Sequence, residues 1–213
     1  MEIFDMHCHL LPGIDDSKAS WDRLEETFSF YRACGISGVC FTPHLYNPYV
    51  TTHVADIRAS YERAAAIAAG QGLKTGLGSE VYVSEQEQVK GIPMFGRYLL
   101  IEFSTRYAPP NLMEKIRSVL PLTPIIAHIE RYGWLDPDSA VVDEMKDMGC
   151  LIQVNGKAFG KGSGGERIRR FLERGVVDII ASDSHGSLED IRNMAASLAA
   201  NPQIIRKMGS LAR

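Results

Sequence analysis

The chain has 213 residues, of which 45% are hydrophobic and 23% are charged, and its formal net charge at pH 7 is −3. This composition is ordinary for a globular protein and excludes wholesale disorder, a collagen-like chain and a small disulfide-dense scaffold. The slight negative charge gives no reason to expect nucleic acid or an anionic membrane as a partner.

No apolar run approaches the roughly 18–20 residues that a membrane-spanning helix needs. The N-terminus lacks the basic and apolar segments of a signal peptide, which predicts a cytoplasmic protein. The cysteines form no Cys-x-x-Cys pair, and in a reducing compartment we expect free thiols. These cysteines are Cys8, Cys34, Cys40 and Cys150.

Short apolar runs alternate with longer helix-like stretches along the chain. The runs predict strands over Ile3–Met6, Gly38–Thr42, Leu73–Val81, Tyr98–Phe103, Pro124–Ile129, Cys150–Val154 and Val177–Ser182. Helical spacing predicts helices over Ser20–Ala33, Val54–Ala69, Asn111–Leu120, Asp138–Met148, Glu166–Glu173, Leu188–Ala200 and Pro202–Met208.

This strand-then-helix alternation indicates parallel strands joined by right-handed crossovers. The fold class is therefore α/β, as an open doubly wound sheet or a closed barrel. No Gly-x-Gly-x-x-Gly or Walker loop follows the first strand, which disfavours the nucleotide-binding version. We find no linker or internal repeat and expect a loop at Gly160–Gly165, too short to divide domains, so residues 1–213 are predicted to form one domain.

Every histidine except His53 lies at or just after the end of a predicted strand, and acids occupy equivalent places. Because the carboxyl ends of parallel strands face a common mouth, we expect these side chains to converge in space. His53 precedes a helix and is expected to be solvated. The converging set is His7, His9, His44, Glu80, Glu102, His128, Asp183 and His185.

The His-x-His spacing at 7 and 9 has a physical meaning. Residues i and i+2 of a strand point to the same face, so both imidazoles can reach one metal ion. Asp183 and His185 repeat the spacing, whereas Cys8 points to the other face and is interpreted as a packing residue. Imidazole and carboxylate together suit zinc, iron and manganese, and the sequence therefore predicts a metal cluster.

Several segments resemble a known family, the PHP (polymerase and histidinol phosphatase) superfamily of metal-dependent phosphoesterases. The most specific are Phe-Asp-Met-His-Cys-His-Leu-Leu-Pro-Gly-Ile-Asp-Asp at 4–16 and Ala-His-Ile-Glu-Arg-Tyr at 127–132. They are similar to the bacterial protein-tyrosine-phosphatase branch, which is associated with capsule and exopolysaccharide tyrosine kinases. The resemblance implies a distorted (β/α)7 TIM-like barrel, in agreement with the strand runs above.

The resemblance also implies three divalent metal ions, of manganese, iron or zinc. One ion would be held by His7, His9, Glu80 and Asp183. Glu80 would bridge to a second, which Glu102 and His128 complete. The third would take His44, His185 and an acid of the Asp15-Asp16 pair, of which the family pattern favours Asp16.

The family carries arginines that bind the phosphate. Arg131 matches the arginine three residues after the fifth-strand histidine. Arg192 is the nearest candidate for the second, although it follows His185 by a longer spacing than is usual in the family. The phosphotyrosine preference depends in part on this second arginine.

The implied reaction is hydrolysis of a phosphate monoester. Clustered divalent cations lower the pKa of a bridging water from about 15.7 toward 7, which supplies hydroxide at neutral pH. Arg131 can offer a bidentate fork to a phosphate oxygen, and Asp183 is a candidate to assist the leaving phenolate.

Three functions are compatible with this site. The first is a phosphatase of phosphotyrosine proteins, with the tail of a bacterial tyrosine kinase as a substrate. The second is the same chemistry on a small ester such as histidinol phosphate, and the third is a non-catalytic kinase-binding barrel stabilised by metals. Short loops after most strands favour an open mouth and thus the first.

Other catalytic classes lack essential residues. No cysteine is followed by an arginine at the Cys-x5-Arg spacing of thiol phosphatases, and no Gly-x-Ser-x-Gly elbow accompanies the Ser182–His185 run. Aromatic residues near strand ends suggest either stacking on a substrate ring or packing of the barrel rim. They are Tyr46, Tyr49, Tyr107 and Tyr132.

Overall fold

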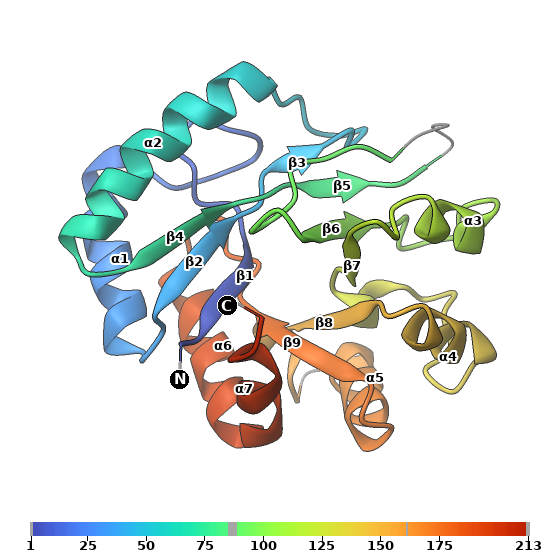
Figure 1. Ribbon diagram of the computed structural model, residues 1–213. Coiled ribbons are helices and arrows are strands. Elements are labelled where there is room, and N and C mark those ends of the chain that lie inside the picture. Colours follow the sequence, from blue (N-terminus) through green and yellow to red (C-terminus); the bar gives the residue numbers. More distant parts are fainter. Residues whose placement is uncertain (1, 85–88, 161, 212–213) are drawn as a thin grey trace.

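The computed structural model describes residues 2–84, 89–160 and 162–211 (Figure 1). Its strands are all parallel where they pair within the two sheets. They are β1 (Phe4–Cys8), β2 (Gly38–Phe41), β3 (His44–Leu45), β4 (Lys74–Leu77), β5 (Glu80–Tyr82), β6 (Tyr98–Glu102), β7 (Thr123–Ile126), β8 (Leu151–Asn155) and β9 (Val177–Ala181). The α/β class predicted from the sequence is confirmed.

The strands form a sheet with the order β1-β2-β4 and a second with the order β3-β5-β6-β7-β8-β9. β2 lies within the predicted strand Gly38–Thr42, and β3 is a further short strand that follows it after a break at Thr42 and Pro43. The single strand predicted over Leu73–Val81 is divided at Gly78 and Ser79 into β4 and β5. Proline has no N–H for a ladder bond, which explains the first break. A Cβ on Gly78 would lie 2.4 Å from Met94 Cγ, so only glycine fits the second.

The two sheets together make a ring of parallel strands. At the open edges, β1 meets β9: the amide of His9 donates to the carbonyl of Ser184 at 2.8 Å, and the amide of Asp183 donates to the carbonyl of His7 at 2.9 Å. Cys8 and Ser184 form a parallel bridge there. The predicted TIM-like barrel of the PHP type is thus supported by the strand order, with β2/β3 and β4/β5 each counting once around the ring.

A buried carboxyl group stabilises this closure. Asp5 of β1 is fully buried and accepts hydrogen bonds from Ser182, through both the amide and the hydroxyl, and from Tyr31 Oη at 2.7 Å. Tyr31 belongs to α1 (Leu24–Ala33), so one side chain joins the first strand, the last strand and a covering helix. Because buried polar groups are costly when unpaired, this set of bonds favours the closed ring.

The helices lie around the outside of the strands (Figure 1). After α1 they are α2 (Val54–Gly70), α3 (Leu112–Arg117), α4 (Ala140–Asp147), α5 (Gly162–Glu173), α6 (Leu188–Ala200) and α7 (Pro202–Met208). Short 3-10 turns occur at Trp21–Arg23, Ile129–Arg131 and Gly156–Ala158. The buried apolar side chains between helices and strands make one core.

The glycine-rich segment at Gly160–Gly165 corrects an expectation. The sequence predicts a loop, but α5 already begins at Gly162. A Cβ on Gly165 would lie 2.9 Å from the backbone nitrogen of Gly160 and 3.1 Å from the carbonyl oxygen of Ala158. The missing side chain lets the first turn of the helix pack against the preceding chain, and this tertiary contact outweighs the low helix propensity of glycine.

Candidate metal centre

The structure brings all the predicted metal ligands to the carboxyl-terminal end of the barrel. His7 lies in β1, His44 in β3, Glu80 in β5 and Glu102 at the end of β6, and the others follow β1, β7 and β9. All are buried except Asp16 and His185. The resulting cluster consists of His7, His9, Asp16, His44, Glu80, Glu102, His128, Asp183 and His185.

Two of these residues have unusual backbones. His128 has φ 30° and Asp183 has φ 49°, in the left-handed region that residues other than glycine rarely adopt. His128 follows Ala127 just after β7, and Asp183 follows Ser182 just after β9. Both side chains point into the mouth, toward Glu80 and His7 respectively. Such conformations persist only where surrounding bonds hold them, and they concentrate at functional sites.

The nitrogen atoms of His7 and His9 show why a cation fits the cluster. His7 Nδ1 donates to Gln153 Oε1 at 3.2 Å. His9 Nδ1 donates to Asp15 Oδ2 at 3.0 Å. A neutral imidazole with its proton on Nδ1 presents a lone pair at Nε2, and these two Nε2 atoms lie 3.1 Å apart. Glu80 Oε2 lies 3.2 Å from each of them. Three electron-pair donors thus face one another, and a divalent cation is the group that satisfies all three.

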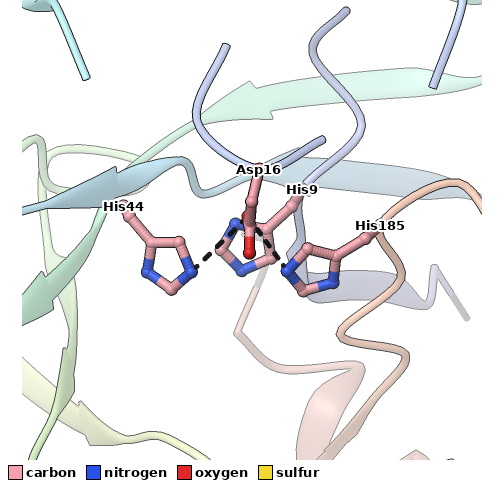
Figure 2. Close-up of side chains that lie close together, drawn as sticks. All are labelled: His9, Asp16, His44 and His185. Carbon is pink, nitrogen blue, oxygen red and sulfur yellow. Dashed lines mark ion pairs between the residues drawn. The ribbon is translucent and has the colours of Figure 1, made fainter. Parts of the chain in front are cut away.

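A second group surrounds Asp16 (Figure 2). The carboxylate Oδ1 lies 3.2 Å from His185 Nε2 and 3.8 Å from His44 Nε2. The His9 ring stacks on the His185 ring with centroids 4.3 Å apart. Ligand atoms of all four residues lie within 4.8 Å of one another, so they could hold one ion. Asp15 instead accepts hydrogen bonds from His9 Nδ1 and from the amide of His44. Asp16 is therefore placed among the possible ligand atoms, whereas Asp15 positions His9.

Glu80 also belongs to a third group, with His44 and Glu102. His44 Nδ1 lies 3.1 Å from Glu80 Oε2 and 3.3 Å from Glu102 Oε1. His128 Nε2 approaches the same acids, at 2.9 Å from Glu80 Oε1 and 3.7 Å from Glu102 Oε2. The central position of Glu80 between the groups fits the bridging role that the resemblance implies.

The electrostatics keep the acids ionised. Burial alone raises the pKa of Glu80, but in the metal-free site the charge of protonated His7 and the hydrogen bond of His128 outweigh it and hold the pKa well below its usual value. Burial likewise opposes ionisation of Asp183, but the charges of His7 and Arg131 hold its pKa far below the usual range. Both carboxylates therefore remain available as ligands at any physiological pH.

Two side-chain amides of β8, Gln153 and Asn155, contact the cluster, and the sequence analysis did not predict them as site residues. Gln153 Oε1 accepts from His7 Nδ1 and, at 2.7 Å, from the amide of His128. Gln153 Nε2 donates to Asn155 Oδ1, and Asn155 Nδ2 donates to Asp183 Oδ2 at 2.9 Å. The i, i+2 spacing of two polar residues in an apolar strand was the available signal, the same spacing as in His-x-His.

The two predicted arginines differ in position. Arg131 Nη2 donates to Asp183 Oδ2 at 2.5 Å, at the edge of the cluster. Arg192 is exposed on α6, where its guanidinium lies 5.4 Å from the centroid of the Phe30 ring. Within residues 2–84, 89–160 and 162–211, no hydrogen bond or ion pair joins Arg192 to the cluster.

The tyrosines also separate into two kinds. Tyr132 is fully buried, stacks on Trp134 and accepts a hydrogen bond from the amide of Phe103, so it packs the rim. The other three predicted tyrosines are exposed, and together with Tyr82 and nearby prolines they line a groove of about 350 Å³. We call it the tyrosine groove; its lining includes Tyr46, Pro48, Tyr49, Tyr82, Tyr107 and Pro109.

The remaining expectations concern a histidine and the thiols. His53 is exposed, as expected. Cys8 is buried, and its Sγ donates to the carbonyl of Cys40, which confirms a packing role. Burial raises the pKa of Cys150 to about 11. All the cysteines are free thiols.

Comparison with known proteins agrees with this geometry. A family model described as capsular polysaccharide synthesis, CpsB/CapC, matches residues 3–211. The chain belongs to the CpsB/CapC family. It is 31% identical over 201 residues to tyrosine-protein phosphatase CpsB of Streptococcus pneumoniae, which covers 86% of this chain and 83% of that protein.

Solved structures with the same fold extend the CpsB/CapC comparison. One comes from work on YwqE from Bacillus subtilis and CpsB from Streptococcus pneumoniae, described as unique metal-dependent tyrosine phosphatases. It has a TM-score of 0.73 at 21% identity and covers 96% of this chain and 95% of that one. Histidinol phosphate phosphatase from Lactococcus lactis has a TM-score of 0.59 at 12% identity, and the match covers 97% of this chain and 94% of that one.

Among the described residues, no helix is long and apolar enough to cross a membrane. The cytoplasmic location stays a prediction.

Proposed function

We propose that this chain is a metal-dependent phosphatase that removes phosphate from tyrosine residues of proteins. The proposal depends on one observation: the Nε2 atoms of His7 and His9 and a carboxylate oxygen of Glu80 face one another as three electron-pair donors. Membership of the CpsB/CapC family supports it, since relatives in that family are named tyrosine-protein phosphatases.

The cluster suits three divalent ions of manganese, iron or zinc. The sets implied by the resemblance are His7, His9, Glu80 and Asp183; Glu80, Glu102 and His128; and Asp16, His44 and His185. When bound, the ions supply Lewis acidity, which brings the pKa of a water near neutrality and offsets negative charge on the phosphoryl group. The donor set of imidazole and carboxylate fits these metals.

The side chains around the cluster have distinct tasks in this scheme. Arg131, more than a third exposed at its side chain, presents its guanidinium to a phosphate oxygen while it pairs with Asp183. Because the charges around Asp183 hold its pKa far below the usual range, Asp183 acts as a ligand and not as a proton donor. A phenolate, with a pKa near 10, leaves with less need of a proton than an alkoxide does.

The tyrosine groove favours a protein substrate over a small ester. Tyr49 and Tyr82 line this groove and also face the hollow that contains Glu102 of the cluster. Asn47 lines the same hollow, and its Nδ2 donates to Glu102 Oε1 at 2.9 Å. A polypeptide whose phosphotyrosine enters the cluster can therefore lay its flanking residues in the groove. We infer that the physiological substrate is a tyrosine kinase of polysaccharide synthesis. We also infer that residues 1–213 act as one domain.

The test is turnover by the purified protein with added Mn²⁺. A phosphotyrosine peptide, a phosphoserine peptide and histidinol phosphate are compared, with and without a chelator. We expect hydrolysis of the phosphotyrosine peptide, loss of activity after chelation and recovery on adding the metal.

Matched histidine variants sharpen this test. His7→Ala removes a buried donor and should lower kcat at least 1,000-fold, on the order of what loss of a main catalytic element costs. His53→Ala removes an exposed imidazole outside the cluster and should leave turnover unchanged. Full activity in His7→Ala contradicts the metal assignment, a preference for histidinol phosphate supports the small-ester function, and a metal-loaded protein that hydrolyses none of the substrates supports the binding barrel.

A further inference from the structure

Lys157 stands beside the cluster without a role in the scheme above. It belongs to the 3-10 turn that follows β8, and its Nζ donates to the carbonyl oxygen of Asp183 at 3.2 Å. The same Nζ lies 3.6 Å from Asp183 Oδ2, the oxygen that Arg131 Nη2 binds at 2.5 Å. Two cationic side chains from different turns therefore flank one carboxylate oxygen.

The backbone of this lysine is firmly placed. A Cβ on the preceding Gly156 would lie 2.3 Å from Met194 Cα, so the turn sits directly on α6. Ser197 Oγ of the same helix donates to the carbonyl of Gly156 at 3.1 Å. These contacts fix the backbone from which the side chain of Lys157 starts, so no backbone has to be ordered when the side chain binds a ligand.

The ammonium group has capacity left for a ligand. Lysine carries three donors, and the carbonyl of Asp183 accepts one of them. The side chain of Lys157 is 31% exposed, whereas that of Asp183 is 2% exposed. Lys157 also borders a hollow of about 340 Å³, whose lining includes His185 of the cluster and the backbone turn at Gly186. A group that approaches the cluster through this hollow therefore meets the ammonium.

The carboxylate that Arg131 and Lys157 share also faces the histidines of the cluster. Asp183 Oδ1 faces His7 and His9 Nε2 at 3.5 and 3.6 Å, so its negative charge is shared with the metal-binding side of the cluster. Asp190 Oδ2 lies 4.0 Å from Lys157 Nζ. An anion with several oxygens can use both Arg131 and Lys157 at once, as a phosphoryl group does.

We propose that Lys157, together with Arg131, binds the non-bridging oxygens of the substrate's phosphoryl group, in the role that the sequence predicts for Arg192. The inference rests on the proposed function for its substrate. It differs from the sequence prediction because Arg192 lies against the Phe30 ring of α1, whereas Lys157 reaches the edge of the cluster from the turn that follows β8.

The experiment compares Lys157→Met and Lys157→Arg with Lys74→Met and Arg192→Gln. Lys74 is exposed on β4, pairs with Glu2 and does not line this hollow, so it controls for a general loss of positive charge. Binding of inorganic phosphate to the Mn²⁺-loaded protein is measured by calorimetry, alongside kcat, KM and metal content. Lys157→Met should weaken phosphate binding about tenfold or more and raise KM, with unchanged metal content. Lys157→Arg should recover most of the affinity, and the two control variants should change it less than about twofold.

Two results would overturn the inference. One is wild-type phosphate affinity in Lys157→Met. The other is a loss of metal from that variant in parallel with its loss of phosphate affinity, which makes the lysine a support for Asp183. If the wild-type protein binds phosphate but hydrolyses no phosphotyrosine peptide, the proposed function fails, while the calorimetric comparison of variants still decides the role of Lys157.

Discussion

Gln153 holds His7 from the side of the ring that faces away from the cluster, with Oε1 accepting from Nδ1 at 3.2 Å. The same oxygen accepts from the amide of His128, whose left-handed backbone it helps to hold. Because a backbone N–H can only donate, the oxygen of Gln153 must face it, and this fixes which nitrogen of His7 carries the proton. One amide thus directs the lone pair of His7 and the turn that carries His128.

Replacing this amide should loosen the metal centre without unfolding the barrel. For Gln153→Met we expect a 10- to 100-fold loss of metal affinity, on the order of what is found when a hydrogen-bond partner of a metal ligand is removed. Metal titration by calorimetry and elemental analysis measure it. Gln203→Met, an exposed position on α7, is the control. Unchanged metal affinity in Gln153→Met would show that His7 needs no such support.

Metal binding should depend on pH. Burial disfavours the charged form of His9, but the hydrogen bonds of Asp15 and Glu80 outweigh it and raise its pKa well above the usual value. In the metal-free protein this imidazole therefore holds a second proton at neutral pH, which a metal ion must displace. The apparent metal affinity should fall as the pH falls and level off above the raised pKa.

Calorimetry in two buffers of different ionisation enthalpy measures the protons released. At pH 6.5 we expect release of one proton or more for each protein that fills its sites, and less as the pH rises. His53→Ala should release the same number. Binding without proton release at pH 6.5 would mean that the free rings are already neutral.

The closure of the barrel gives a prediction on stability. Tyr31→Phe removes the hydroxyl that donates to Asp5 Oδ2 at 2.7 Å, and both groups are fully buried. The expected loss in free energy of unfolding is about 1–3 kcal/mol, typical for a buried acceptor that loses a partner. Chemical denaturation measures it. Tyr61→Phe, which loses a half-buried contact with Thr75 at 3.3 Å, should cost less. Equal losses would argue against the special role of Asp5.

Much of the fold and the cluster can be read from the sequence because the barrel imposes a simple rule. Strands covered on both faces are apolar, so a histidine or acid at a strand end stands out, and parallel order brings those ends together. The Asp15-Asp16 pair stayed open for a physical reason: adjacent acids differ in direction only once the loop is folded. In the folded loop, Asp15 accepts a hydrogen bond from His9 Nδ1, and Asp16 faces His44 and His185.

Other parts of the site depend on how the helices and strands pack together, and residue type marks them weakly or not at all. Arg192 is near His185 in sequence, but it follows the buried Ile191 on α6, and the helix turns it toward Phe30. Gln153 carries no charge and no metal preference, so nothing in its residue type marks it as part of the site.

The tyrosine groove yields a prediction that separates protein substrates from small ones. Tyr49 is 89% exposed and lines both the groove and the hollow next to Glu102. An aromatic contact with a peptide is worth about 1 kcal/mol, so Tyr49→Ala should lower kcat/KM for a phosphotyrosine peptide about fivefold. Turnover of p-nitrophenyl phosphate, which has no flanking residues to lie in the groove, should not change. Leu120→Ala, at an exposed apolar side chain outside the groove, should affect neither substrate. An equal loss on both substrates would place Tyr49 at the cluster itself, and no loss on either would mean that the peptide leaves the mouth by another path.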